Sequence, residues 1–414
     1  MENVPEEFII EISSFMNDND IEMMDSKLDL YDIVNKYLEK NQGDDSFMIV
    51  DVGDVIRQYN KWKKMLPRIT PYYAIKCNPS TILLDLLHKL GCSFDCASKN
   101  EISRVISIGV DPDRIIFANP CKMITQIKYA RANDIDLLTF DSSHELYKIK
   151  LYHPNARLLL RIQVDDSKSL CRFNCKFGVE LEEVLPILTL AKQLNIDVCG
   201  VSFHVGSGCH DAQVYRSALE VCSKVFDISA RDVQKPMNTV DIGGGFPGVD
   251  SGEISFEAIC KVLQDAMDEF FPSTTDNNTS EDVAFIAEPG RYFVSSSHTL
   301  VVSIINKKEY TEKDTKERIN IYYISDGIYG SFSGILFDYA QLELLPFNER
   351  NEKTFKSIVF GPTCDSLDII SKECQLPSLA IGESILIRNI GAYSTASATE
   401  FNGFTKPFCY YIMS

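Results

Sequence analysis

The sequence predicts an α/β fold: a (β/α)8 barrel joined to a C-terminal domain made mostly of β-strands. Eight short apolar segments alternate with helix-length segments before Arg291, and conspicuous polar residues follow the ends of the apolar segments. Strands that alternate with helices favour a parallel sheet, and eight such units favour a closed barrel. After Arg291 helical patterns become rare, which predicts the second domain.

The predicted barrel strands, in chain order, are Tyr72–Lys76, Ser93–Ala97, Ile115–Asn119, Leu137–Asp141, Leu158–Val164, Val198–Val205, Thr239–Gly243 and Ala284–Glu288. The segments between them carry apolar residues at three- and four-residue spacing, which is typical of helices. The clearest of these are Thr81–Leu90, Lys99–Ile108 and Leu181–Leu194. We therefore place the barrel domain at residues 46–290. Within it, the polar segment Pro272–Asp282 is expected to be an exposed loop.

Four later segments predict strands joined by loops: Val294–Ile304, Ile319–Ile324, Ser357–Phe360 and Ser384–Ile390. The segment 1–45 precedes the first barrel strand. We assign it, together with residues 291–414, to the β-domain.

The composition is that of a folded protein with an acidic surface. The chain has 414 residues, 45% hydrophobic and 24% charged, and a net charge of -18. This length favours two domains. The negative charge repels phosphate backbones, so we expect no nucleic-acid partner, and it suits a small cationic substrate.

The chain start and the cysteines indicate the compartment. Met1–Ile10 lacks the basic and apolar regions of a secretory signal, and no apolar run has the length of a membrane span. We therefore expect no membrane association. The thirteen cysteines are scattered and odd in number, which favours reduced thiols and a cytoplasmic location. No cysteine pair has further ligands at zinc spacing, so no metal site is expected.

Lys76 closes the first predicted strand and precedes the turn signal Asn78-Pro79. An amine at a strand end, partly out of water, loses proton affinity and can attack a carbonyl. This chemistry can hold an aldehyde cofactor as a Schiff base. A solvated surface lysine is the commoner outcome for such a segment, so this interpretation depends on the rest of the chain.

Other polar residues also stand at or just after the ends of predicted strands: Asp95, Asn119, Asp141, Arg161, His204, Gly243–Gly245, Glu288 and Arg291. Barrels of this class build their active sites at the C-terminal ends of the strands. The sequence therefore predicts an active site at this face.

Two segments predict a phosphate and ring site. Gly243–Gly248 follows the seventh predicted strand, where glycines let backbone N–H groups approach an anion. Glu288 ends the eighth strand, and a buried carboxylate can pair with a pyridinium N–H. Arg291 can add a phosphate contact, and the alternative is a structural ion pair. His204 can lie against a ring and Ser207 can bind phosphate, although a lone histidine is more often a core residue.

The β-domain offers groups for a substrate. Cys364 can give a proton, and the neighbouring Asp365 can pair with a distal ammonium group. Phe337-Asp338 offers a second carboxylate. Two acids facing a chain-end amine would select a basic substrate, although each motif alone is compatible with an ordinary loop.

Together, these segments occur in the order found in the eukaryotic ornithine decarboxylase family, which the chain resembles over essentially its whole length. The segments that carry the resemblance are Tyr72–Asn78, Ser202–Ser207, Gly243–Gly248, Glu288–Arg291, Ser325–Phe332, Cys364-Asp365 and Gly391–Tyr393. The resemblance implies a pyridoxal-5'-phosphate (PLP) enzyme of decarboxylase group IV, with an alanine-racemase-like TIM barrel. It implies decarboxylation of L-ornithine to putrescine, the first step of polyamine biosynthesis.

The resemblance also implies roles around the cofactor. Lys76 would form the Schiff base, Glu288 would face the pyridine nitrogen, and His204 would stack on the ring. The remaining cofactor-binding positions would be Asp95, Arg161, Ser207, Gly243, Gly244, Gly245, Pro289, Gly290, Arg291 and Tyr393.

Substrate roles follow from the same resemblance. Phe337, Asp338 and Asp365 would bind the substrate, and Cys364 would reprotonate the product carbanion. In the family, Cys364 and Asp365 come from the partner subunit of a homodimer, so the active sites would lie at the subunit interface. The chain departs from the family at Ser366, usually glycine, and at Phe337, usually tyrosine.

Several alternatives stay open. A lysine or arginine decarboxylase of the same fold would also bind a substrate that ends in a cation. A non-catalytic homologue that binds antizyme would be free to lose cofactor-site residues, which are present here. Antizyme is a possible partner: the segment Cys121–Phe140 keeps Lys122, Lys128 and Arg131, although basic residues on a helix usually form a solvated face.

Overall fold

The computed structural model describes residues 13–25, 28–41, 43–173, 175–250, 254–272, 283–348 and 352–414. The chain divides into two compact units, residues 59–292 and the two chain ends before and after them. The domain limits expected from the sequence, residues 46–290 for the barrel, stay a prediction. Most of the expected loop Pro272–Asp282 lies outside the described residues.

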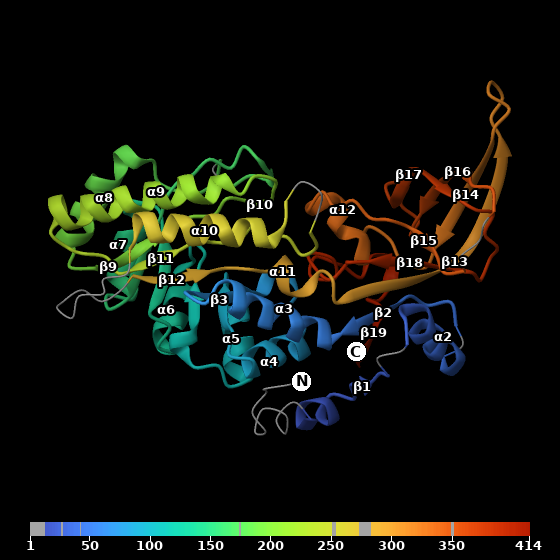
Figure 1. Cartoon of the computed structure of the whole chain (residues 1–414), viewed down its shortest axis with the longest axis horizontal. Coiled ribbons are helices and arrows are strands. Elements are labelled where there is room, and N and C mark those ends of the chain that lie inside the picture. Colours follow the sequence, from blue (N-terminus) through green and yellow to red (C-terminus); the bar gives the residue numbers. More distant parts are fainter. Residues whose placement is uncertain are drawn as a thin grey trace. The chain divides into compact units, whose positions relative to one another are not determined.

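The unit of residues 59–292 contains a closed barrel of eight parallel strands, in the order β11-β12-β3-β4-β5-β6-β7-β9 (Figure 1). The strands are β3 (Ile69–Ala74), β4 (Ser93–Cys96), β5 (Ile115–Phe117), β6 (Leu137–Phe140), β7 (Arg157–Arg161), β9 (Asp197–Ser202), β11 (Thr239–Asp241) and β12 (Ala284–Ala287). The predicted barrel is confirmed, and each predicted segment overlaps one strand, although β3, β7 and β9 begin before the predicted Tyr72, Leu158 and Val198. Each strand ends earlier than predicted, because the last polar residues already belong to the loops above the barrel.

Helices follow the strands in this unit. They are α4 (Thr81–Lys89), α5 (Lys99–Ser107), α6 (Ile124–Ala132), α7 (Ser143–Tyr152), α8 (Leu181–Gln193), α9 (Gln213–Ile228) and α10 (Phe256–Phe270), while α3 (Val52–Met65) and the short α11 (Arg291–Val294) extend across the limits of the unit. Serines start two of them directly after a strand: Ser98 caps α5 and Ser142 caps α7, each by accepting an N–H from the third residue on. Figure 1 shows α8, α9 and α10 side by side.

The barrel interior is filled by side chains from its strands. Its apolar interior layer consists of Tyr72, Ile116, Leu159, Cys199 and Ile286. Such a layer is a packed core, so the site can lie only at an end of the barrel. A two-stranded antiparallel ribbon, β8 (Ser169–Cys171) and β10 (Ser207–Cys209), stands in the loops that follow β7 and β9.

The unit of the chain ends is mostly β, as predicted. Its main sheet has the order β1-β19-β2-β13-β14-β16-β17, and β18 pairs with β13 and β15. The elements are β1 (Glu22–Met23), α2 (Leu30–Lys40), β2 (Phe47–Asp51), β13 (His298–Thr311), β14 (Arg318–Ile324), α12 (Gly334–Phe337), β15 (Leu345–Pro346), β16 (Phe355–Phe360), β17 (Ile369–Leu376), β18 (Ser384–Arg388) and β19 (Phe408–Met413). β13, with 14 residues, is the longest of the described strands and forms an orange hairpin with β14 in Figure 1.

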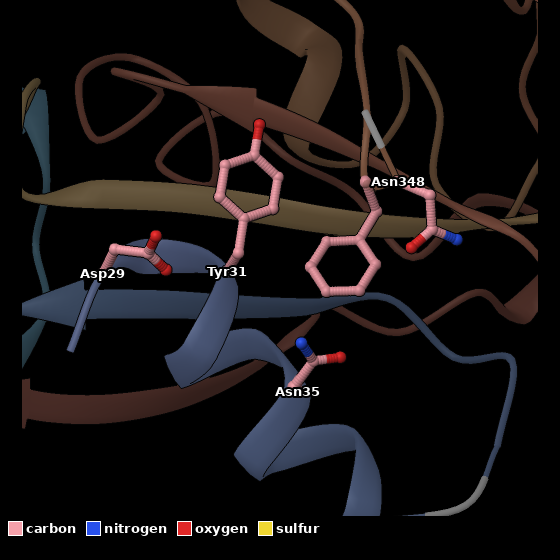
Figure 2. Close-up of a pocket in the computed structure, with 5 residues that line it drawn as sticks. Asp29, Tyr31, Asn35 and Asn348 are labelled. Atoms are coloured by element: carbon pink, nitrogen blue, oxygen red, sulfur yellow. The ribbon is translucent and has the colours of Figure 1, made fainter. Parts of the chain in front are cut away.

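A hollow of about 370 Å³ lies beside α2, lined by Asp29, Tyr31, Asn35, Phe347 and Asn348 (Figure 2). Its side chains already serve the local fold. Asp29 forms a capping box at the start of α2, and the rings of Tyr31 and Phe347 pack 5.7 Å apart. None of the residues that the sequence singles out lines it.

Within the described ranges, no helix is both long and apolar enough to cross a lipid bilayer. The same ranges contain no cluster of three or more His, Cys, Asp or Glu placed to hold a metal ion.

Candidate active site

A polar layer lies above the apolar interior at the C-terminal ends of the barrel strands. Arg161 comes two residues after the interior Leu159 and therefore projects to the same side of β7. In the strand register, Arg161 lies opposite Ser202 of β9, and Ser202 lies opposite Asp241 of β11. Asp241 lies opposite the interior Ile286 of β12. The register thus brings Arg161, Ser202 and Asp241 from three neighbouring strands side by side, at the face where the sequence predicts the active site.

Lys76 lies just beyond β3, in a 3-10 turn of residues Ile75–Cys77. Its Nζ donates to Oδ2 of Asp95 at 2.7 Å, and the lysine side chain is 44% exposed while that of Asp95 is buried. The other oxygen of Asp95 is buried without a hydrogen-bond partner in the described structure. The ion pair therefore holds the lysine amine at the barrel mouth, next to a carboxylate with a free acceptor position.

Asp241 and Glu288 form a buried carboxyl pair at the ends of β11 and β12. The backbone N–H of Glu288 donates to the carbonyl of Gly243 at 2.7 Å, which joins the two strand ends. Burial raises the pKa of Asp241 to about 7. Burial, and then the charges of Asp241 and Asp95, raise the pKa of Glu288 well above its usual range. Neighbouring buried carboxylates resist ionising together, so the pair retains a proton and would gain from a cationic partner.

His204 lies in the loop after β9. Its Nδ1 accepts the backbone N–H of Gly206 at 2.9 Å, which leaves Nε2 as the protonated nitrogen of the neutral ring. Loss of hydration, and then the charges of Arg161 and Lys76, lower the pKa of His204 well below its ordinary value. The ring is therefore neutral and apolar enough to lie against another flat ring.

The glycines after β11 are required by the approach of the His204 loop. Gly243 has φ of +65°, and a Cβ there would lie 2.2 Å from the carbonyl oxygen of Phe203. A Cβ on Gly244 would lie 2.8 Å from Nε2 of His204. The predicted glycine turn is thus packed directly on the histidine, which any larger residue would displace.

The groups expected to bind phosphate gather at the same end of the barrel. The guanidinium of Arg291 donates to Oγ of Ser207 at 3.1 Å. A Cβ on Gly245, which has φ of +104°, would lie 2.8 Å from the carbonyl oxygen of Gly206, so these two loops touch. A guanidinium, a hydroxyl and glycine backbone together form a cradle suited to a phosphate group.

The turn Pro289-Gly290 closes the cradle against the lysine loop. The carbonyl of Pro289 accepts the N–H of Ala74 at 3.1 Å. A Cβ on Gly290 would lie 2.8 Å from Cβ of Cys77, so only glycine allows this approach. Lys76 is thereby held close to the Glu288 segment by backbone contacts.

A second group of predicted residues lies in the unit of the chain ends. Cys364 is exposed on the loop between β16 and β17, and its N–H donates to Oδ1 of Asn402 at 2.9 Å. The neighbouring Asp365 accepts a hydrogen bond from the hydroxyl of Tyr329. The N–H of Leu367, and then that hydroxyl, lower the pKa of Asp365.

The remaining members of this group lie around α12. Asp338 is buried at the C-terminal end of that helix, next to the exposed Phe337. A Cβ on Gly334, at the start of α12, would approach the carbonyl oxygen of Tyr393 to 3.1 Å, so Tyr393 lies beside the helix. Ser366 does not have a positive φ, so the backbone at this departure from the family does not require glycine.

Comparison with known proteins gives the family. Residues 52–295 match the family model of the pyridoxal-dependent decarboxylase, pyridoxal binding domain. Mouse ornithine decarboxylase is 44% identical over 97% of this chain and 89% of its own length. The chain belongs to the pyridoxal-dependent decarboxylases. Antizyme inhibitor 2 of Xenopus laevis is 43% identical over 93% of this chain and 85% of its own. The structure of the Paramecium bursaria Chlorella virus arginine decarboxylase aligns with a TM-score of 0.85 at 35% identity, over 92% of this chain and 100% of that one.

The cofactor of this pyridoxal-dependent decarboxylase is pyridoxal phosphate, and the barrel residues fit it. The Ser207–Arg291 cradle suits the phosphate, and the proton-retaining carboxyl pair suits the pyridine nitrogen. Lys76 offers the amine, and its partner Asp95 has an unsatisfied buried oxygen.

Sequence reasoning missed Asp241, the second half of the carboxyl pair. The signal was a carboxylate inside an apolar strand, two residues before the glycine turn. Two of the polar strand ends that it did single out serve the loops. Asn119 accepts the N–H of Cys121 at 3.2 Å, and Asp141 accepts the N–H of Gly178 at 3.0 Å.

The expectation of a solvated basic face was wrong for Lys122. This residue precedes α6 and is buried, with Nζ 3.0 Å from a carboxylate oxygen of Glu145 on α7 and 2.6 Å from the carbonyl of Thr139. Burial lowers the pKa of Lys122 to about 8. Lys128 and Arg131, on α6 itself, are exposed as expected.

Proposed function

We propose that this protein decarboxylates L-ornithine to putrescine and carbon dioxide, the first step of polyamine biosynthesis. The observation that carries the proposal is the barrel-end constellation, in which the Lys76–Asp95 ion pair, the Asp241–Glu288 carboxyl pair and the Ser207–Arg291 cradle meet on one face. Its similarity to mouse ornithine decarboxylase supports the choice of substrate.

Each barrel residue has a role in this proposal. Lys76 would supply the amine that holds the cofactor through its aldehyde, and Asp95 would orient that amine. Glu288 faces the pyridine nitrogen, and His204 lies against the ring. Ser207, Gly245, Gly290, Arg291 and Tyr393 would surround the phosphate. The other cofactor-binding residues would be Arg161, Gly243, Gly244 and Pro289. When bound, the cofactor supplies an electron sink for the electron pair released as carbon dioxide leaves.

The β-unit supplies the substrate groups. Asp338 and Asp365 receive the distal ammonium of the substrate, and Phe337 packs beside it. Cys364 returns a proton to the α-carbon of the product as a general acid. The exposure of Cys364 and the low pKa of Asp365 support these roles, because the donor must reach the substrate and the acceptor must stay ionised.

The protein acts as a homodimer in this proposal, with Cys364 and Asp365 completing the active site of the partner subunit. Apolar side chains exposed around the loops that carry the substrate groups support a protein contact here. They are Leu336, Phe337, Tyr339, Leu367, Phe401 and Phe404.

Antizyme is the further partner that we propose. Exposed apolar side chains occur on α6, on α7 and at the residue before α6, namely Met123, Ile124, Tyr147 and Leu151. Of these, Leu151 lines one hollow with the exposed Lys128 and Arg131. A mixed apolar and basic surface suits an acidic protein partner. We also propose a cytoplasmic location, since all thirteen cysteines lie in described segments and are free thiols.

The test is release of the product amine by the purified protein with added pyridoxal phosphate, supplied separately with ornithine, lysine and arginine. Putrescine from ornithine, abolished in K76A, supports the proposal. Cadaverine or agmatine as the main product would instead indicate a lysine or arginine decarboxylase of the same fold. Cofactor binding without any product would favour a non-catalytic homologue that binds antizyme.

A further inference from the structure

A buried carboxylate joins two loops of the β-unit. Asp368, 1% exposed, lies immediately before β17. Its Oδ1 accepts the backbone N–H of Ile328 at 2.9 Å. Its Oδ2 accepts both the N–H of Thr363 at 3.0 Å and the hydroxyl of Thr363 at 2.7 Å. One side chain therefore holds the loop 325–331 and the loop 361–368 together through three hydrogen bonds.

The backbone around Asp368 is shaped to admit this carboxylate. A Cβ on Gly327 or on Gly361 would lie 2.3 Å from its Oδ1, so each loop presents a glycine where the carboxylate enters. The N–H of Gly361 also donates to the carbonyl of Asp368 at 2.9 Å, which closes the loop 361–368 at its base. Hydrogen bonds to an ionised acceptor are about twice as strong as neutral ones, so such a contact fixes a loop firmly.

The loop that Asp368 closes is the one that presents Cys364 and Asp365. Within it, the N–H of Leu367 donates to Oδ1 of Asp365 at 2.9 Å, and the N–H of Asp368 donates to the carbonyl of Asp365 at 3.1 Å. Thr363, the residue held by Asp368, directly precedes Cys364. Because one peptide bond joins Thr363 to Cys364, a displacement of Thr363 also displaces the Cys364 thiol.

We propose that Asp368 is a positioning residue for the reaction: through Thr363 it holds the loop so that the Cys364 thiol and the Asp365 carboxylate reach the substrate in register. The inference rests on the proposed function and deepens it. Asp368 does not touch the substrate in this account. Its loss acts on proton return through Cys364 and on recognition of the distal ammonium through Asp365.

The test compares D368N and T363V with T363S and with the control Y322F. D368N replaces one acceptor oxygen by a donor that faces other donors, T363V removes the hydroxyl alone, and T363S keeps it. Tyr322 is a matched control, because its buried hydroxyl bonds Pro377 and Leu379 in the same unit, outside the loop. Two quantities are measured on the pyridoxal-phosphate-loaded protein: kcat and KM for ornithine, and the rate at which iodoacetamide alkylates Cys364.

Peptide mass spectrometry supplies an internal reference, since Cys121 is also exposed and lies in the barrel unit. We expect D368N to lower kcat/KM about ten- to a hundredfold, the range for a lost hydrogen bond to a charged group. T363V should also lower kcat/KM, and T363S, which keeps the hydroxyl, should have the wild-type kcat/KM. In D368N and T363V the ratio of Cys364 to Cys121 alkylation should change severalfold, while Y322F leaves it unchanged.

Wild-type kcat, KM and alkylation ratio in D368N would overturn the inference. An equal loss of activity in D368N and Y322F, with an unchanged alkylation ratio, would also overturn it, because Asp368 would then be only structural. If the wild-type protein released no amine, the proposed function would fail, and the alkylation ratio would still decide whether Asp368 and Thr363 position Cys364.

Discussion

Replacing Asp241 by asparagine should stabilise the protein freed of its cofactor, and the gain should grow with pH. Burial raises the pKa of Asp241 from its ordinary 3.8 to about 7. The folded state thus binds more protons than the unfolded chain between these values. The stability that this carboxyl contributes is complete below pH 3.8 and is lost as the pH rises to about 7.

The size of the effect follows from the shift. About three pKa units at about 1.4 kcal/mol each give a loss of about 4 kcal/mol above pH 7. D241N removes this loss and keeps the favourable contacts. The amide oxygen can still accept the N–H of Gly243, now 2.9 Å from Oδ1, and the amide nitrogen can donate to Glu288, the hydrogen-bond partner of the Asp241 carboxyl.

Urea unfolding between pH 5 and pH 8.5 measures the effect. The fluorescence of Trp62, the single tryptophan and a buried residue, reports the barrel unit. The matched control is D113N. Asp113 is an exposed aspartate of the same unit, and its replacement changes the net charge equally. The free energy of unfolding of D241N should exceed that of the wild type by several kcal/mol at pH 8.5 and by much less at pH 5. Parallel stability curves for the two proteins, or a less stable D241N at pH 8.5, would refute the reasoning.

Two further predictions concern the glycine turn and a buried histidine. A Cβ in G244A would meet Nε2 of His204 at 2.8 Å, so the affinity for pyridoxal phosphate should fall about five- to 150-fold, from a clash of about 1–3 kcal/mol. G43A, with no atom within 4 Å of the new Cβ, should leave the affinity unchanged, and equal effects of the two would contradict the packing argument. Burial lowers the pKa of His298 to about 4, so the unfolded chain binds the extra proton and stability falls as the pH drops from 6.5 to about 4. In H298Q, the free energy of unfolding measured in urea should fall by about 3 kcal/mol less than in the wild type over this pH range. An equal fall in both proteins would show that the histidine is not the group responsible.

The barrel could be predicted because its signals are local. Each strand is a short apolar run that ends in a polar residue, and each helix shows its own period. Parallel strands in a barrel bring their C-terminal ends together, so Lys76, Asp95 and Arg161 could be placed at one face without coordinates. The exact strand limits were misjudged: β3 already begins at Ile69, and residues such as Lys76 leave the ladder and enter the loops.

The missed features are non-local. Asp241 becomes one half of a carboxyl pair only through the register of β11 with β12, more than forty residues later in the chain. Asp368 acts on Ile328 across the β-unit, and nothing near it in sequence indicates that contact. In the sequence Lys122 has the pattern of a surface residue, but in the fold it is buried in an ion pair with Glu145 of α7. Sequence patterns report which residues are polar, and tertiary contacts decide which of them are buried together.

The most direct test of the account is a competition in one reaction. Purified protein with pyridoxal phosphate is given equal concentrations of ornithine, lysine and arginine, and the three product amines are quantified by mass spectrometry. At early times their ratio equals the ratio of the kcat/KM values. We predict that putrescine dominates and that K76A forms none of the three. Dominance of cadaverine or agmatine, or undiminished putrescine from K76A, would contradict it.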